Sequence, residues 1–410
     1  MWLRLLYLFY FLPITNIMRN VKAVFDIWND TIKAIVIGND EWKEIILAKQ
    51  IETTQGMRKG KILDSEGFAN TINKILETFV KKLWGDFIDE TFVSISHPEA
   101  IINRVVEQKR IMREDIQEED VDHLSKVISE ISHKNNYETI KIVPVHRIID
   151  ETKKEKDPIW MKGKKLELVA DVFMIPKNLY NGLIDSFERI GVKISDIIPN
   201  IIAASEIALD YDQKDLGTIL IDIGKNQTTY VIYEDGYTIG HGVIPIGGED
   251  VTKDISIGMQ IDIKEAENIK KTHGSATIYK DQIPNDSQID NLFLSDIINA
   301  RYEEIFNKIN KHLKHLDKEG RLAGGIVLIG GWSKILNGDL LAKDIFKLAT
   351  FYGKDNFLNL GDISSNVLFT NVLGAYIRSN KYTEGRKSSF KFNMNFDIVN
   401  TITKFFKNLF

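Results

Sequence analysis

The chain has 410 residues, of which 43% are hydrophobic and 27% are charged, and it contains no cysteine. This composition is typical of a soluble globular protein, and the length predicts two or more domains. The formal net charge of −5 argues against a nucleic-acid-binding protein, which would carry a basic excess. The absence of cysteine excludes disulfides, thiol catalysis and thiolate metal sites, and it fits a cytoplasmic protein.

The first 17 residues contain the apolar run WLRLLYLFYFLPI. A run of about a dozen residues is short of the roughly 20 that span a bilayer as a helix. Its only positive flank is Arg4, and no small-residue cleavage site follows, which argues against a signal peptide. We interpret residues 1–17 as an extension upstream of the true start at Met18, with a second membrane contact as the alternative.

Apolar alternation and apolar runs predict strands, and helical periodicity predicts helices. The predicted strands are residues 21–26, 32–37, 45–50, 91–96, 166–175, 218–223, 229–234 and 326–329. The predicted helices are residues 65–83, 178–190, 201–210, 264–272 and 294–316. A strand hairpin followed by a helix therefore occurs twice, once from Val21 and once from Thr218. This repetition predicts two similar α/β lobes with a cleft between them.

The first lobe is predicted to consist of residues 18–102 and 176–200, separated by an insertion at 103–175. The insertion has its own charged helix at 118–133 and a strand at 139–144. Residues 201–378 form the second lobe, with an outer subdomain at 253–320. After Arg378 the chain is polar and almost free of aliphatic residues, so we predict a flexible linker at 379–394.

The last sixteen residues, 395–410, have an amphipathic pattern when wound as a helix. Phenylalanines on one face and lysines on the other suit the plane of an anionic bilayer, whereas the commoner alternative is a terminal helix docked on the protein body. We predict an interfacial membrane helix on a tether. Its membrane-binding residues are Phe396, Val399, Ile402, Phe405, Phe406, Leu409 and Phe410, with Lys404 and Lys407.

Two hairpins and a late glycine pair carry residues typical of a nucleotide site. A strand that ends on an acid and is followed by a polar turn holds phosphate in several nucleotide-binding proteins. The first hairpin is FDIWNDTIKAIV (25–36), the second is ILIDIGKNQTTYVIY (219–233), and the late element is GIVLIGGWSKILNG (325–338). Each element alone is a weak signal, because glycine pairs after strands are common turn chemistry. The three elements in this order are a stronger signal.

The ordered triple resembles the actin-type ATPase superfamily and, within it, the FtsA family of bacterial cell-division proteins. The resemblance also rests on GMRKGKILD (56–64), KDPIWMKGKKLELVA (156–170), VIPIGGEDVTKDISIGM (243–259) and EAENIKKTHGSA (265–276). It implies an actin-like two-lobed α/β fold, a duplicated ribonuclease-H-like unit, with an inserted α+β subdomain in the first lobe. It also implies ATP with Mg in the cleft, with Asp26 and Asp222 at the metal. The implied cofactor-binding residues are Asp26, Asn29, Thr31, Asp222, Gly224, Lys225, Thr228, Gly330 and Gly331.

The sequence departs from the family pattern where phosphate would bind. Trp28 and Asn29 replace a glycine and a hydroxyl residue, and Asp30 adds a negative charge. In the second hairpin, residues 225–227 replace Gly-Gly-Thr, and Thr229 replaces an aspartate. Glycines let backbone amides approach an anion without a Cβ in the way, so we expect weakened phosphate binding. We predict no catalytic residue and at most weak ATPase activity.

Arg301 and Glu304 lie three residues apart on a predicted helix. They form either an ordinary intrahelical ion pair or part of the surface that, by resemblance, receives the C-terminal peptide of the tubulin-like protein FtsZ. The eight histidines lack metal-ligand spacing, and we predict surface positions for them.

The resemblance implies a division adaptor, located on the inner face of the cell membrane at the division site. Such a protein tethers FtsZ filaments to the membrane, self-assembles into actin-like filaments and meets later division proteins. Two alternatives remain open: an ATP-dependent enzyme of the actin and sugar-kinase superfamily, and a PilM-like pilus-assembly scaffold.

Overall fold

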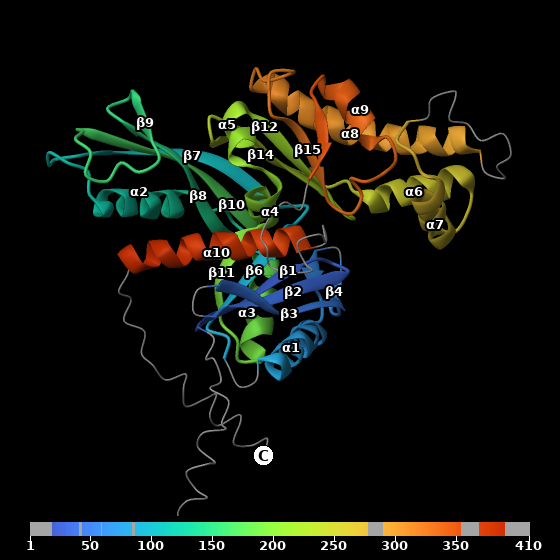
Figure 1. Cartoon of the computed structure of the whole chain (residues 1–410), viewed down its shortest axis with the longest axis horizontal. Coiled ribbons are helices and arrows are strands. Elements are labelled where there is room, and N and C mark those ends of the chain that lie inside the picture. Colours follow the sequence, from blue (N-terminus) through green and yellow to red (C-terminus); the bar gives the residue numbers. More distant parts are fainter. Residues whose placement is uncertain are drawn as a thin grey trace, which may run out of the picture.

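The computed structural model describes residues 19–40, 43–58, 60–83, 87–277, 290–353 and 369–389. Within these residues the chain forms two α/β lobes and a further subdomain beside them (Figure 1). The predicted N-terminal extension (1–17) and the predicted membrane helix (395–410) lie outside the described residues, and so do the last residues of the predicted linker, 390–394.

The sheet of the first lobe has five strands in the order β11-β6-β1-β2-β3. The first three strands in sequence pair antiparallel, and β6 and β11 are parallel to β1. Alternate residues of β1 bury opposite faces, so that Phe25 packs against helices α1 and α3 while Val24 packs against α10. The elements are β1 (Arg19–Ile27), β2 (Thr31–Asp40), β3 (Lys43–Thr53), the short β4 (Met57–Arg58) and β5 (Lys61–Ile62), α1 (Ser65–Lys82), β6 (Glu90–Ile95), α3 (Lys177–Arg189) and β11 (Ile194–Pro199).

The sheet of the second lobe repeats this design, with five strands in the order β14-β13-β12-β15-β16. Again a meander of three antiparallel strands is followed by two parallel strands. The same topology in both lobes confirms the prediction of a duplicated two-lobed fold. The elements are α5 (Tyr211–Leu216), β12 (Thr218–Ile223), β13 (Thr228–Glu234), β14 (Tyr237–Ile244), α6 (Gly248–Met259), α7 (Ile263–His273), α8 (Asn291–His315), β15 (Gly325–Ile329), α9 (Gly338–Phe346) and β16 (Thr350–Tyr352).

Two helices, α4 (Asn200–Ala208) and α10 (Thr370–Ser389), lie side by side between the lobes (Figure 1). Helix α4 is buried on almost all sides, as a hydrophobic helix in the centre of a protein should be. The two helices cross so closely that a Cβ on Gly374 would overlap the carbonyl of Ala203. The two helices between the lobes, α4 and α10, are therefore packed tightly against each other.

The predicted linker is wrong at its beginning, because α10 continues through residue 378 to Ser389. Ser379 is completely buried. Next to it, the side-chain amide of Asn380 accepts a hydrogen bond from Lys22 Nζ (2.9 Å) and donates one to Glu44 (3.1 Å). These contacts with the first lobe hold a polar sequence in a helix that its composition did not predict.

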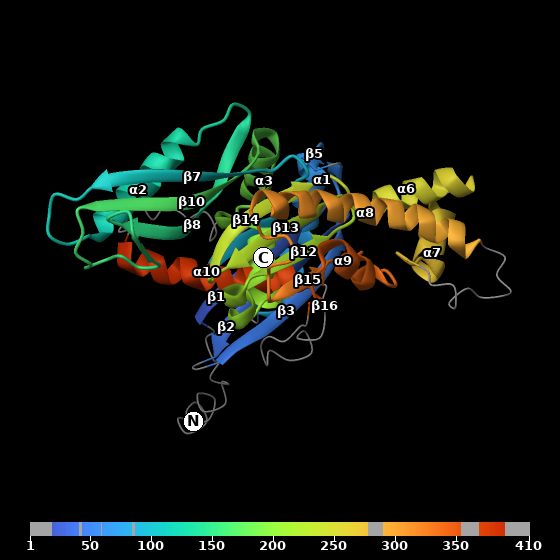
Figure 2. The same cartoon turned by 90° about the horizontal axis from the view of Figure 1, so that it is seen from above.

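The inserted subdomain is a four-stranded sheet in the order β7-β10-β8-β9, with α2 packed on one face. It lies at the opposite end of the molecule from α6 and α7 (Figures 1 and 2). Its elements are β7 (Ile101–Arg110), α2 (Glu118–Ile131), β8 (Tyr137–Ile149), β9 (Lys153–Glu155) and β10 (Lys165–Pro176).

A buried polar cluster fastens the inserted subdomain to β14 of the second lobe. Arg104 donates two hydrogen bonds to Asp171, both at 2.9 Å, and one to the Thr238 carbonyl at 2.7 Å. His241 Nε2 lies 2.6 Å from Asp171 Oδ2. Burial alone would raise the pKa of Asp171, but the bonds from His241 and Arg104 outweigh it and hold the pKa at about 2. The prediction of surface histidines is wrong for His241 and for His97, which are both buried.

Candidate functional site

The turns of the two equivalent hairpins, β1–β2 and β12–β13, contribute to one cavity of about 450 Å³, which we call the interlobe cavity. The end of β15 and the start of α10 complete it. Its lining therefore comes from both lobes. The lining residues are Trp28, Asn29, Asp30, Thr31, Lys33, Asp222, Gly224, Lys225, Asn226, Ile329, Gly330, Gly331, Trp332, Lys334, Thr370 and Asn371.

Seven of the nine predicted cofactor-binding residues line this cavity; Asp26 and Thr228 do not. Thr228 is completely buried, and its hydroxyl donates a hydrogen bond to the Ile246 carbonyl at 2.9 Å. The structure therefore does not bring Thr228 to the interlobe cavity, because the hydroxyl is used inside the second lobe. The seven are Asn29, Thr31, Asp222, Gly224, Lys225, Gly330 and Gly331.

Asp26 lies at the end of β1 and is completely buried. The Trp28 indole N–H donates to Asp26 Oδ2 at 2.7 Å, and the Asn200 side chain donates to Oδ1 at 3.0 Å. Lys33 Nζ lies 3.8 Å from Oδ2. Burial raises the pKa of Asp26, while Lys33 and these donors oppose the rise. Both carboxylate oxygens are thus engaged by groups of the chain itself.

Asp222 occupies the equivalent position in the second lobe, near the end of β12. Burial and, second, the negative charge of Asp26 raise the pKa of Asp222 to about 6. The two predicted metal ligands are therefore close enough for the charge of Asp26 to disfavour ionisation of Asp222.

A divalent cation is bound by oxygens with free lone pairs, among which ionised carboxylates contribute the opposite charge. Asp222 meets this need at the cavity wall, whereas Asp26 would have to lose its bonds from Trp28 and Asn200. Among the residues that the structure describes, no three acidic or histidine side chains gather in a metal-binding group. The residues present do not fit a metal site built on both aspartates.

Gly330 and Gly331 follow β15, which is paired with β12, and line the cavity beside the end of the second hairpin. Gly330 has φ +95°, and a Cβ there would lie 2.5 Å from the Ile223 carbonyl oxygen and closer still to the Asp222 carboxylate. A side chain is therefore excluded at Gly330. Gly331 has open space around it. The next residue, Trp332, also lines the cavity, and Lys270 Nζ lies 3.4 Å from the centre of its ring.

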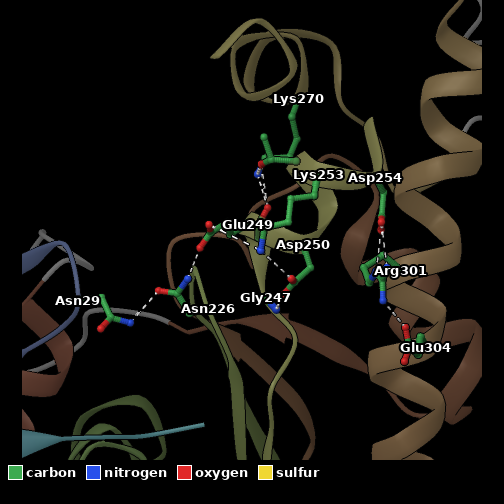
Figure 3. A network of polar contacts seen from close by, with 12 residues as sticks. Asn29, Asn226, Gly247, Glu249, Asp250, Lys253, Asp254, Lys270, Arg301 and Glu304 are labelled. Carbon is green, nitrogen blue, oxygen red and sulfur yellow. Dashed lines mark hydrogen bonds and ion pairs between the residues drawn. The ribbon is translucent and has the colours of Figure 1, made fainter. Parts of the chain in front are cut away.

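The hairpin turns also contact each other directly. Lys225 Nζ lies 2.7 Å from Asp30 Oδ2, and the Asn29 side chain donates to Asn226 Oδ1 at 3.1 Å. Asn226 in turn donates to Glu249 on α6 (Figure 3). A Cβ on Gly224 would lie 3.2 Å from the Trp28 ring. These contacts link the two lobes across the interlobe cavity.

A second group of charges lies between α6 and α8, and we call it the α6–α8 charge cluster. Arg301 donates to both carboxylate oxygens of Asp254, at 2.7 and 2.9 Å, and to Glu304 at 2.6 Å (Figure 3). The predicted Arg301–Glu304 contact is therefore present. Asp254 was not predicted, because it lies 47 residues away on a helix that the sequence pattern did not reveal.

Exposed apolar side chains accompany this cluster on the same pair of helices. Ile257 on α6 is 77% exposed, and Leu292 and Phe293 on α8 are 47% and 45% exposed. The helices approach each other at Gly258, where a Cβ would lie 3.7 Å from Phe293. Apolar side chains beside a charged cluster are typical of a protein interaction surface.

Solved structures with the same fold support the assignment of the architecture. The PilM–PilN type IV pilus biogenesis complex matches with a TM-score of 0.61 and 14% identity, over 87% of this chain and 98% of that chain. MreB5 of Spiroplasma citri bound to ADP matches with a TM-score of 0.54 and 14% identity, over 90% of this chain and 99% of that chain. The chain therefore has an actin-like fold.

Sequence comparisons are more specific. The family model "Cell division protein FtsA" matches residues 219–374, and "SHS2 domain inserted in FTSA" matches residues 99–174. The cell division protein FtsA of Bacillus subtilis (strain 168) is 27% identical over 91% of this chain and 84% of the relative. That of Borreliella burgdorferi is 27% identical over 91% of this chain and 95% of the relative. The chain belongs to the FtsA family of cell division proteins.

Within the part of the chain that the structure describes, none of the helices combines the length and the apolar character needed to cross a bilayer.

Proposed function

We propose that the protein is a membrane-tethering adaptor that binds FtsZ filaments through the α6–α8 charge cluster and holds them at the inner face of the cell membrane. The observation that carries this proposal is the pairing of Arg301 with Asp254 beside the exposed Ile257 and Phe293. Asp254 and Glu304 hold the Arg301 guanidinium in place through three of its five N–H groups. The two remaining N–H groups can donate to a polar group of a bound peptide, and the apolar side chains can receive aliphatic residues of the same peptide.

The membrane contact is assigned to the predicted amphipathic helix at 395–410. A single interfacial helix binds weakly, but assembly into filaments places many such helices on one surface. Self-association of the actin-like body therefore strengthens membrane attachment. Family membership and the lysine and phenylalanine faces of the terminal sequence support this part of the proposal, and later division proteins are further candidate partners.

The nucleotide takes a secondary role in this proposal. ATP or ADP would contact Gly330 and Gly331 with its nucleoside and Lys225 with its phosphates, and Mg would contact Asp222. The negatively charged Asp30 carboxylate already pairs with Lys225. The oxygens of Asp26 accept hydrogen bonds from Trp28 and Asn200. Phosphoryl transfer depends on a tightly held phosphate and metal. These contacts argue for weak binding without useful hydrolysis, and against the alternative of an ATP-dependent enzyme.

Peptide binding tests the proposal directly. A synthetic peptide of the FtsZ C-terminus is titrated into the full chain, into Ile257→Glu and into Arg301→Ala. Both variants should bind at least about tenfold more weakly, a loss of about 1.4 kcal/mol. Arg113→Ala is the matched control, since Arg113 also pairs with two acids, Glu119 and Asp120, but in the inserted subdomain.

The outcome separates the alternatives. If wild type and all variants bind the peptide equally, the α6–α8 charge cluster is not the FtsZ site. If wild type shows no binding but binds a pilus-assembly peptide, the PilM-like scaffold is the better function.

A further inference from the structure

Each of the two hairpin turns is held by hydrogen bonds within its own lobe, and the turns contact each other across the interlobe cavity. In the first lobe, Thr54 Oγ1 donates to the Trp28 carbonyl at 2.8 Å and Gly60 N donates to Asn29 Oδ1 at 2.6 Å. In the second lobe, Gly248 N donates to the Gly224 carbonyl (3.0 Å) at the start of α6. Because each turn is bonded to its own lobe, the contacts between the turns connect the two lobes.

An ion pair and a hydrogen bond join the two turns, and Gln227 of the second turn also donates to Ser96 of the first lobe. Lys225 meets Asp30 at 2.7 Å, and Asn29 meets Asn226 at 3.1 Å. Glu249 accepts a hydrogen bond from Asn226 and so fixes that side chain (Figure 3). The link therefore continues from the first lobe, through the turn, into α6 of the second lobe.

The positive charge of Lys225 can pair either with the Asp30 carboxylate or with a phosphate. Lys225 lines the cavity and is a suitable point cation for a phosphate oxygen. The carboxylate of Asp30 already occupies its ammonium group. An entering polyphosphate would have to displace this carboxylate and then remain next to its negative charge.

We propose that Asp30 competes with the phosphates of a nucleotide for Lys225. We also propose that the Asp30–Lys225 and Asn29–Asn226 contacts keep the lobes joined when no nucleotide is bound. The proposal rests on the assignment of the interlobe cavity as the nucleotide site. It explains how the two turns stay joined although Trp28 and Lys225 stand where the family pattern has glycine. The ligand class whose binding it weakens is the polyphosphate anion.

The expected effect is moderate because the ion pair is partly solvated. The side chains of Lys225 and Asp30 are 50% and 48% exposed, so their attraction is screened by water and salt. Removing the charge of Asp30 frees the lysine and removes the repulsion together. We expect about tenfold tighter binding of polyphosphate, with a larger factor at low ionic strength.

Calorimetric titration of the full chain with tripolyphosphate and with ATP tests this competition. Asp30→Asn should bind both anions about tenfold more tightly than wild type, whereas Asp30→Glu, which keeps the charge, should not. Adding Lys225→Ala to Asp30→Asn should abolish the gain. Glu114→Gln is the matched control, because Glu114 pairs with Lys162 at 3.5 Å on the surface of the inserted subdomain.

Each outcome has a definite meaning. Equal affinities of Asp30→Asn and wild type for both anions, or no binding by either, would overturn the competition. A gain for tripolyphosphate without a gain for ATP would support the internal competitor and reject the nucleotide site proposed above.

Small-angle X-ray scattering measures the second part of the proposal, the link between the lobes. The double variant Asp30→Asn with Asn226→Ala should have a larger radius of gyration than wild type when no nucleotide is present. An unchanged radius would show that these contacts do not hold the lobes together.

Discussion

Replacing Gly330 with alanine should destabilise the second lobe far more than the same change at Gly331. The two glycines are adjacent and both line the interlobe cavity, so the pair differs only in local geometry. At Gly330 the backbone is in a left-handed conformation, with φ +95°, and a Cβ would overlap the Ile223 carbonyl oxygen and the Asp222 carboxylate. At Gly331 a Cβ would meet nothing within 4 Å.

The magnitude follows from these two terms. A non-glycine residue at such a backbone angle costs roughly 1–3 kcal/mol. The overlap adds to this cost, because the Ile223 carbonyl belongs to a central strand and cannot move away freely. We therefore expect Gly330→Ala to lower the free energy of unfolding by about 3 kcal/mol, and Gly331→Ala to change it by less than about 0.5 kcal/mol.

Thermal unfolding followed by circular dichroism measures the difference. At roughly 2–4 °C per kcal/mol for a unit of this size, Gly330→Ala should melt about 6–12 °C below Gly331→Ala. Equal melting temperatures for the two variants would refute the argument that the close approach of this backbone to Asp222 requires glycine.

Four further predictions concern charge, the cavity and the membrane. Asp222→Asn should be more stable than wild type at pH 8, by up to about 3 kcal/mol, because the raised pKa of about 6 makes the ionised carboxyl costly in the folded state. This advantage should disappear as the pH falls from 6 to 4. Denaturant unfolding at several pH values measures the difference in free energy of unfolding. Asp171→Asn should be less stable than wild type at pH 7. The difference in free energy of unfolding should narrow as the pH falls from 4 to 2, because the folded-state pKa of about 2 lies below the unfolded value of 3.8. A difference that stays constant with pH would reject the Arg104 and His241 contacts as its source. Trp28→Gly should tighten ATP binding, as measured by calorimetry, since the indole packs against Gly224 where phosphate would approach; an unaltered dissociation constant would count against this. Replacing Phe405 and Phe406 with glutamate should abolish vesicle binding, and unchanged binding would reject the terminal helix as the anchor.

The sequence predicted the elements with strong apolar patterns. Strands β12 and β13 lie within a residue of their predicted bounds, because their buried residues form nearly continuous apolar runs. The duplicated hairpin then predicted two lobes, and the turns at Trp28 and Lys225 do meet at one cavity.

Other elements could not be predicted from local pattern. Strand β7 is largely exposed and rich in charged residues, and α6 begins with glycine and has only Val251, Thr252 and Ile255 as buried side chains beyond its first residue. Helix α10 ends in a polar segment that is held by docking of its earlier turns on the first lobe.

Contacts between segments that are far apart in the chain could not be predicted from the sequence either. Lys225 was among the implied cofactor-binding residues, and nothing in its neighbourhood revealed that Asp30, in the other lobe, would pair with it. Asp254 lacked a signal for the same reason, since its pairing with Arg301 depends on how α6 packs on α8. Such pairs are set by tertiary packing of elements that are far apart in the chain.

Co-sedimentation with anionic vesicles tests the adaptor function most directly. FtsZ filaments are mixed with vesicles and either the full-length chain or a chain that ends at Met394. We predict that the full-length chain carries FtsZ into the vesicle pellet, and that the shortened chain binds FtsZ but leaves it in the supernatant. If the full-length chain binds neither vesicles nor FtsZ, the protein shares the family's fold without the adaptor function, and the account is contradicted.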